Sequence, residues 1–398
     1  MKSFGIFLKE EVEEGSKLKH ITHPEDRPLM HGHEGFEHAH KALMQAHEHM
    51  KAGHKSTNLT MKFDGSPSIV FGHHPKTGKF FVATKSAFNK NPKINHTEAD
   101  IDKNHGHAPG LASKLKVALK ELPKVAPKKG VYQGDLMHTK EDLRESTVSF
   151  TPNTITYTAR GKEADRIKKS KIGVAVHHEY HGSDIGNMKA SPHPDLSNFK
   201  EHPNVHLHGA EHDTSKVKHS DESEKTFQKH MTAAKEIHDT HGHKMYAAVH
   251  PKHSGESGHL ATYINKTVRH DEVPNVKGFK EHLKDVHEKM ASKVTTDKSK
   301  EAKRSEGAAQ VAHVEKNKSH YANLLSQHHH LAQAKNVLVK SLESHEGRYT
   351  HHIGNKKSKP EGFVINTKLD GDKEEPSKLV NRAEFAKANL LKSHKKVL

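Results

Sequence analysis

One lysine lies in a sequence setting that suits covalent chemistry. Lys62-Phe63-Asp64-Gly65-Ser66 falls inside an apolar run, residues 58–71, that reads as two short strands. A lysine amine becomes a nucleophile once it has lost its proton, which requires a pKa lowered by burial, nearby cations or a metal. Gly65 allows a ligand to approach the backbone closely. Lys62 is therefore a candidate nucleophile, and the alternative is an ordinary surface lysine at a strand edge.

Four further short motifs follow this lysine in order, each on a predicted strand. They are Tyr132-Gln133-Gly134-Asp135-Leu136, Ile172-Gly173-Val174-Ala175-Val176-His177, Glu361-Gly362-Phe363-Val364-Ile365 and Lys378-Leu379-Val380. They contribute an acid, a histidine, a second acid and a second lysine, respectively. One Lys-x-Asp-Gly pattern arises easily by chance, but five elements in order on predicted strands are far more specific.

Together these stretches resemble motifs I, III, IIIa, IV and V of the covalent nucleotidyltransferases, the superfamily of ATP-dependent DNA ligases, RNA ligases and mRNA-capping enzymes. In that superfamily the motif I lysine attacks the α-phosphate of a nucleotide and holds it as a phosphoramidate. The Gly65-Ser66 pair looks most like the phage-type RNA ligases. The resemblance covers roughly residues 58–180 and 360–385. It implies an α+β fold, with a ligase-type nucleotidyltransferase domain of antiparallel sheets flanked by helices.

The resemblance also implies roles for individual residues. Lys62 would be the nucleophile, and Lys378 would balance charge on the α-phosphate as pyrophosphate leaves. The nucleotide-binding positions would be Asp64, Gly65, Asp135, His177 and Glu361. Asp135 and Glu361 would also hold Mg²⁺ through their carboxylates. The implied cofactors are ATP and Mg²⁺, and the implied reaction activates and joins 5′-phosphorylated nucleic-acid ends; GTP in place of ATP, as in a capping-type guanylyltransferase, stays open.

The chain departs from the superfamily pattern at several positions. Ser66-Pro67 stands near the place where many DNA ligases have arginine, Asp135 replaces the usual glutamate, and Val380 replaces a common second lysine. The stretch between His177 and Glu361 is far longer than usual. Residues 381–398 are too few for the oligonucleotide-binding barrel of DNA ligases and capping enzymes. We therefore expect an RNA-ligase-like protein with an inserted module.

Sequence periodicity divides the chain into four expected parts. Residues 1–57 hold an N-terminal peptide and a helix, and residues 58–183 form the first part of the nucleotidyltransferase domain. Residues 184–346 form a largely helical insertion rich in His and Lys, and residues 347–398 complete the domain. The insertion is either a nucleic-acid-binding module or a solvated helical cover.

Two helices carry the clearest patterns. Apolar residues recur at three- and four-residue steps across residues 33–53. In the insertion, Leu324, Leu331 and Leu338 are seven residues apart, which predicts a helix with a narrow pairing seam. Met245–Val249 and Ala261–Ile264 read instead as short strand-like pieces within the insertion.

Composition favours a polyanionic partner. The 398 residues carry a formal charge of +16 before any of the 43 His is counted. This balance predicts a nucleic-acid partner, and the resemblance favours RNA over DNA as that partner. There is no cysteine, which excludes disulfides and thiolate chemistry, and no run of 18 apolar residues, so we expect no membrane contact.

The histidines invite a metal interpretation. His177, His178 and His181, the run of residues 328–330, and residues 238–243 all have spacings compatible with metal ligands. With 43 His in the chain, such spacings also arise by chance, and none has an obvious carboxylate orienter nearby in sequence.

The first ten residues suggest a location. Residues 1–10 resemble the capsid-targeting peptides of internal proteins in large tailed phages, and Leu8-Lys9-Glu10 matches their L-x-E cleavage pattern. The expected locations are the host cytoplasm and the virion interior. They suit either a phage-encoded ligase or its rival, a non-catalytic basic nucleic-acid-binding protein packaged in a capsid.

Overall fold

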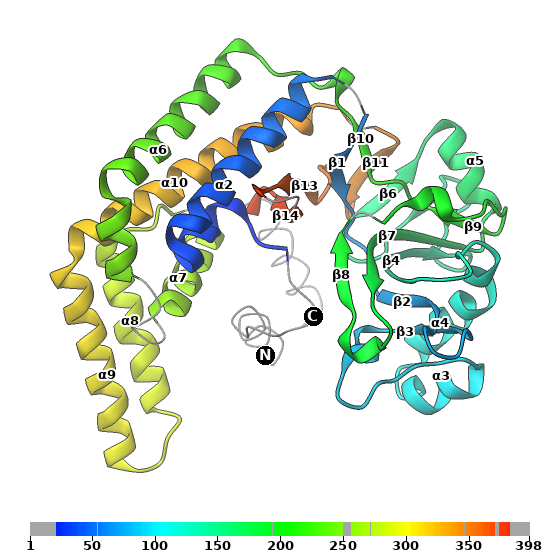
Figure 1. The fold of residues 1–398 in the computed structure, drawn as a ribbon, viewed down its shortest axis with the longest axis horizontal. Helices are drawn as coiled ribbons and strands as arrows, with labels where there is room; N and C mark the ends of the chain where they lie inside the picture. The colour runs from blue at the N-terminus through cyan, green and yellow to red at the C-terminus, as the bar shows by residue number, and fades with distance from the viewer. Residues whose placement is uncertain are drawn as a thin grey trace.

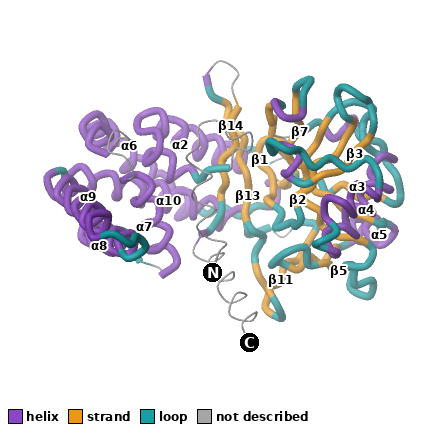
Figure 2. The backbone as a smooth tube through the Cα atoms, turned by 90° about the horizontal axis from the view of Figure 1, so that it is seen from below, coloured by secondary structure: helices purple, strands orange, loops and turns teal. Residues whose placement is uncertain are grey.

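The computed structural model describes residues 21–53, 55–192, 194–249, 256–270, 272–345, 347–370 and 374–382. Figure 1 shows strands gathered in one half of the molecule and helices in the other, with a small sheet between them. The view from below separates the two halves again (Figure 2). The expected α+β class with antiparallel sheets is confirmed; the one parallel pairing between named strands joins β7 and β9. The expected N-terminal peptide, residues 1–10, lies outside the described residues.

The small sheet between the halves is built from distant parts of the chain. Its strand order is β10 (Glu211–Asp213), β1 (Lys55–Lys62), β13 (Gly362–Lys368) and β14 (Glu374–Leu379), all antiparallel. Because side chains alternate along a strand, one face carries Leu59, Phe363, Ile365 and Leu379, which are buried against the helices. Lys62 lies on the opposite face.

A six-stranded sheet forms most of the strand half. Its order is β3 (Phe80–Ala83), β2 (Ser68–His73), β4 (Val131–Thr139), β7 (Ile172–His181) and β8 (Lys189–Pro192), with β9 (Val205–Leu207) beside β7. Helices α3 (Glu98–His105) and α4 (Pro109–Glu121) cover one face, and their apolar side chains share a core with β2, β4 and β7. This sheet carries Asp135 and His177.

A third sheet closes the strand half. It runs β12 (Lys356–Ser358), β11 (Tyr349–Ile353), β6 (Thr156–Ala159) and β5 (Ser149–Phe150), with helix α5 (Gly161–Lys169) after β6. Phe63, Phe150, Tyr157 and Tyr349 form its aromatic core. The residue after Lys62 is therefore anchored in this core.

Among the described residues, the helical half contains six long helices. They are α2 (Arg27–Lys51), α6 (Asp221–Val249), α7 (Glu256–His270), α8 (Val276–Ala291), α9 (Asp297–Lys316) and α10 (Lys318–Leu342). The expected helix is confirmed, and Leu324, Leu331 and Leu338 are buried on α10. The packed face is wider than the expected narrow seam, because twelve residues of α10 are buried. Short 3₁₀ helices lie at η1 (Pro24–Asp26), η2 (Lys85–Phe88), η3 (Leu122–Lys124), η4 (Ile185–Asn187), η5 (Leu196–Asn198) and η6 (Thr214–Lys216).

Two expectations about the insertion differ from the structure. The helices begin at Asp221 rather than at residue 184, because β8, β9 and β10 still pair with the sheets. The strands expected at Met245–Val249 and Ala261–Ile264 are wrong, since both segments are helical. Their buried residues, such as Leu260, Tyr263 and Ile264, follow helical spacing. Helix α2, expected in a separate N-terminal part, packs against α6 and α10.

Candidate functional site

Lys62 faces a carboxylate at the junction of β1 and β13. Lys62 is the last residue of β1 and pairs directly with Gly362, the first residue of β13. This register brings Glu361 against the lysine, with 2.5 Å between Lys62 Nζ and Glu361 Oε2. The Lys62 side chain is 28% exposed and that of Glu361 is 11% exposed. The lysine side chain is therefore partly open to solvent, while the carboxylate is mostly enclosed.

The charges around Lys62 hold its proton. Burial alone lowers the pKa of Lys62, but the carboxylates of Glu361, Asp135 and Asp64 outweigh it and raise the pKa above its usual range. Burial raises the pKa of Glu361. Lys62 lowers that pKa, but by less, so it stays above its usual value. Three acids thus surround one ammonium group, and the cluster attracts a further cation.

Asp64 fixes the segment that follows the lysine. One of its carboxylate oxygens accepts hydrogen bonds from the backbone N–H groups of Thr154 and Ile155, and the other accepts one from the Asn153 side chain. Its own backbone N–H donates to the Tyr157 hydroxyl. Asp64 is buried, so these contacts make it a positioning residue whose charge still acts on Lys62.

Gly65 brings the lysine strand close to Asp135. A Cβ at position 65 would lie 2.4 Å from the Cβ of Asp135 and 3.0 Å from the sulfur of Met137. Any larger side chain would therefore push β4 away from the turn after β1. This contact is with the protein's own strand β4, and the expected approach of a ligand to Gly65 stays a prediction.

Asp135 lies on β4 and is held in its ionised form. Burial raises its pKa, but His177, Lys62 and a hydrogen bond from Ser68 together lower the pKa below its usual range. Ser68 pairs with Asp135 across β2 and β4. Its hydroxyl also accepts from the side chain of Gln133. Ser68 is a residue that the motif analysis missed; only its place directly after Pro67 in the lysine segment could have pointed to it.

A bulge aims His177 at Asp135. Gln133 pairs with His178, but Gly134 pairs with Val176, so His177 is an extra residue on β7. Its Nε2 lies 3.4 Å from Asp135 Oδ1, and its side chain is 35% exposed. The imidazole thus lies at the edge of the site, partly exposed and in contact with His178.

Lys378 shares the face of Lys62 but lies farther away. It pairs with Val364 on β13, two positions along from Gly362, so its Cα lies about 12 Å from that of Lys62. The structure shows its charge acting near His23, whose pKa is lowered first by burial and then by Arg382 and Lys378. Val380 packs over Gly362, beside Lys62.

The cluster around Lys62 offers carboxylate donors for a cation. Two carboxylates, Asp135 and Glu361, stand near one lysine, and hard oxygen ligands of this kind suit Mg²⁺, which binds proteins through one or two carboxylates. Negative charge in excess of Lys62 also favours a cation here. Asp64 has both oxygens occupied by protein donors and does not belong to such a ligand set.

The histidine spacings singled out in sequence do not assemble into separate metal sets. His177 contacts His178, His328 contacts Asp26, and His330 contacts His230. Among the described residues, three other groups bring ligand atoms within 4.8 Å of one another: His33, Glu37 and His238; His47, His219 and Glu224; and Glu163, His206 and His208. All three combine residues distant in sequence, which spacing cannot reveal.

The fold and site define an α+β protein with antiparallel sheets and a lysine–carboxylate cluster where two of them meet. The chain belongs to a family of unknown function (DUF6267), whose sequence profile matches residues 18–395. No curated protein and no solved structure matches the chain. In the part of the chain that the structure describes, no helix has both the length and the apolar character needed to cross a bilayer.

Proposed function

We propose that this protein is an ATP-dependent nucleotidyltransferase of the ligase type. It carries AMP on Lys62 and transfers it to a 5′-phosphorylated nucleic-acid end, RNA rather than DNA. The observation that carries the proposal is the contact between Lys62 and Glu361, with Asp135 acting on the same amine. These three residues come from motifs spread over most of the chain, and they meet at one point.

The proposed reaction has three steps. The deprotonated amine of Lys62 attacks the α-phosphorus of ATP; an N–P bond forms, the bond to the bridging oxygen breaks, and pyrophosphate leaves with the electron pair. A 5′-phosphate oxygen then attacks the same phosphorus, the N–P bond breaks, and the amine regains a proton. Finally a 3′-hydroxyl attacks the activated 5′-phosphate, loses its proton and displaces AMP.

The residues around Lys62 have distinct tasks in this scheme. Glu361 and Asp135 raise the pKa of Lys62 and so keep its amine protonated in the free protein. The amine would become reactive only when another cation binds these carboxylates. Mg²⁺ held by the two carboxylates would supply positive charge beside the phosphates. The partly exposed imidazole of His177 would stack on the base, and Lys378 would add charge on the same face of the sheet.

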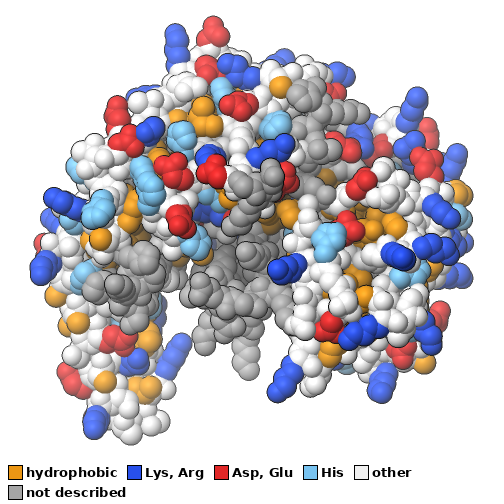
Figure 3. Space-filling view, in the orientation of Figure 1, with side chains coloured by type: hydrophobic (Ala, Val, Ile, Leu, Met, Phe, Trp, Pro, Cys, Tyr) orange, Lys and Arg blue, Asp and Glu red, His pale blue; other side chains and the backbone are white. Residues whose placement is uncertain are grey.

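The surface suits a polyanionic substrate. Lys and Arg side chains lie on both halves of the face shown in Figure 3. Together with the formal charge of +16, they favour contacts to a phosphate backbone, which give affinity without sequence choice. We place this activity in a phage-infected host cytoplasm, with packaging in the virion as a second destination.

One observation favours a second candidate, a non-catalytic nucleic-acid-binding protein of the same fold. Val380 stands where the superfamily commonly has a second lysine, and it packs over Gly362 beside the nucleophile. The positive charge near a bound phosphate would then be too small for turnover, while the basic surface would still bind nucleic acid.

Intact-mass spectrometry tests the proposal. Full-length protein, stripped of bound nucleotide, is incubated with Mg²⁺ and either ATP or GTP, beside Lys62→Ala and the exposed-lysine control Lys76→Ala. We expect a gain of one AMP in the wild type and in Lys76→Ala, and none in Lys62→Ala. If the wild-type protein gains no nucleotide, the proposed enzymatic activity is overturned, and the non-catalytic nucleic-acid-binding protein stands as the function.

A further inference from the structure

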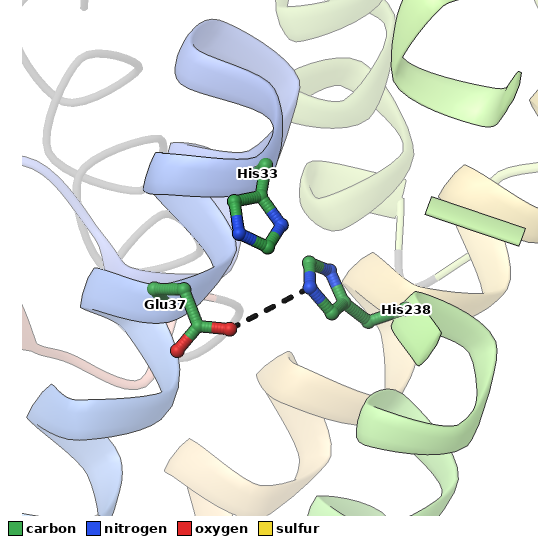
Figure 4. Close-up of side chains that lie close together, drawn as sticks. All are labelled: His33, Glu37 and His238. Carbon is green, nitrogen blue, oxygen red and sulfur yellow. Dashed lines mark ion pairs between the residues drawn. The ribbon is translucent and has the colours of Figure 1, made fainter. Parts of the chain in front are cut away.

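Two histidines and a glutamate converge where α2 crosses α6, in the helical half. His33 and Glu37 lie one turn apart on α2, and His238 reaches them from α6. Figure 4 shows the three side chains pointing toward one another from the two helices. His33 and Glu37 are exposed, whereas the His238 side chain is only 6% exposed.

A chain of hydrogen bonds fixes the tautomer of His238. The Gln327 side-chain N–H donates to the Ala234 carbonyl, which turns Gln327 Oε1 toward Tyr246. The Tyr246 hydroxyl donates its only proton to Gln327 Oε1 at 2.9 Å. Its oxygen therefore accepts from His238 Nδ1, 3.0 Å away. The proton of His238 is on Nδ1, and the lone pair is on Nε2.

That lone pair points at a carboxylate. His238 Nε2 lies 3.5 Å from Glu37 Oε1, so two electron-rich atoms face each other. The His238 ring is stacked between Phe36, with ring centroids 4.0 Å apart, and His33, at 4.7 Å, so the exposed His33 side chain must turn out of this stack to bring a nitrogen to the same ion. A cation bound to both His238 Nε2 and Glu37 Oε1 would remove this repulsion.

Among the described residues, no Lys or Arg forms an ion pair with Glu37 that a metal cation would have to displace. Lys235, one turn before His238 on α6, is paired with Asp239 at 2.6 Å. In the group of His47, His219 and Glu224, by contrast, Lys51 lies 3.6 Å from the carboxylate. In the group around Glu163, Arg348 and the Tyr349 hydroxyl already contact the carboxylate. The His33 group is therefore the one of the three in which no Lys or Arg pairs with the carboxylate among the described residues.

The geometry points to a Zn²⁺ site formed by His33, Glu37 and His238, with water as the fourth ligand. Imidazole and carboxylate ligands at about 2.0–2.1 Å in a tetrahedron stand about 3.3 Å apart, close to the separation of Glu37 and His238. The hydroxyl of Tyr246 supports His238 through its other nitrogen, as outer partners of zinc-bound histidines do. The exposed positions of His33 and Glu37 leave the ion open to solvent.

The ion would fasten α2 to α6 at a bend. Gly32 has φ 56°, a left-handed conformation that breaks the helix just before His33. Tyr246 packs over this glycine, with its Cβ 3.3 Å and its first ring carbon 3.4 Å from the place of a Cβ. The bend, the aromatic packing and the three ligands thus coincide. Since α2 leads into β1, the site would stabilise the element that carries Lys62.

Zinc titration of the full-length protein tests this assignment. Competition with a chromophoric chelator gives the affinity of the tightest site in the wild type, His33→Ala, Glu37→Gln and the double variant. The matched controls are Glu34→Gln on α2 and His243→Ala on α6, both at exposed positions. The changed ligands are exposed, so the variants should fold, and circular dichroism checks this.

We expect one equivalent of Zn²⁺ in the wild type and in both controls, bound at least tenfold more tightly than in either single variant. X-ray absorption of the one-equivalent complex should show two imidazole ligands. Equal zinc affinity in the wild type and the double variant would overturn the site and assign the binding to the other histidines. Neither result depends on whether Lys62 accepts a nucleotide.

Discussion

Glu361 lies 2.5 Å from the amine of Lys62 because Lys62 pairs with the next residue, Gly362, across β1 and β13. Gly362 has φ 149°, and a Cβ there would lie 2.5 Å from the Leu379 carbonyl oxygen. Glycine is therefore required where the strand enters the sheet beside the lysine. The short motif Glu-Gly thus combines a charged partner with the backbone that delivers it.

Replacing Glu361 with Gln should change Lys62 in two opposite ways. The amine loses the carboxylate that most raises its pKa, so acetic anhydride should label Lys62 faster than in the wild type, as read by peptide mass spectrometry. The yield of the proposed lysyl-AMP should fall by about 100-fold, because the carboxylate that would hold Mg²⁺ beside the transferred phosphate is lost. Glu201→Gln, at an exposed position, should change neither. Faster labelling with an undiminished adduct would show that Glu361 only restrains the lysine.

Replacing Gly65 with Ala should damage both stability and adduct formation. The new methyl group would fall 2.4 Å from the Asp135 Cβ, so the strands must separate, at a cost of about 1–3 kcal/mol. Gly110→Ala, on α4 with no atom within 4 Å of the new Cβ, should leave stability equal or raise it by up to about 1 kcal/mol. Urea unfolding and intact mass measure the two effects. Equal behaviour of the two variants would contradict the close approach at Gly65.

The sequence motifs located most of the residues that meet around Lys62. Asp64, Gly65, Asp135, His177 and Glu361 all lie at or beside the cluster. The orientation of His177 cannot be predicted from the sequence, because the bulge that turns it arises only when β7 pairs with β4. The distance of Lys378 likewise depends on the register of β14 against β13.

The fold was predictable in part for the same physical reason. Helical periodicity is local, so helix α10 and the helix before β1 follow from spacing alone. Strands β8, β9 and β10 are three or four residues long and exist because they pair with β7 and β1. Strands this short show too little alternation of apolar and polar residues to be recognised in the sequence. The expected start of the helices at residue 184 is therefore too early.

Acid should weaken the protein through Glu163. Burial raises the pKa of Glu163, but hydrogen bonds from His206 and Tyr349 and the charge of Arg348 bring it down to about 2, below an ordinary value of 4.5. A pKa lower in the folded state means stability that is present above pH 4.5 and is lost as the pH falls toward 2. The difference in unfolding free energy between the wild type and Glu163→Gln should shrink over this range. Glu141→Gln, at an exposed position, is the control, and a constant difference for Glu163→Gln would contradict the assignment.

A buried ion pair should dominate the stability of the helical half. Lys335 on α10 and Glu25 on η1 form a salt bridge with both side chains 1% exposed, and Arg382 contacts the same carboxylate. Lys335→Met leaves that carboxylate without its lysine and should cost about 3–5 kcal/mol, measured by urea unfolding. Lys303→Met removes an exposed pair with Glu306 and should cost at most about 0.5 kcal/mol. In Lys335→Met/Glu25→Gln the loss should be smaller than in Lys335→Met, and an additive loss would count against a coupled pair.

Tyr246→Phe separates the support of His238 from general packing in the helical half. The substitution removes the oxygen that accepts from His238 Nδ1, so the imidazole is no longer held with Nε2 toward Glu37. We expect zinc affinity to fall by about 10–100-fold and the stability of the metal-free protein to fall by about 1 kcal/mol. Tyr263→Phe removes a comparable buried hydroxyl, which donates to the Asn275 carbonyl, and should cost similar stability without changing zinc affinity. If both variants bind zinc as the wild type does, Tyr246 does not position His238 for a metal ion, and the hydrogen bond serves packing alone.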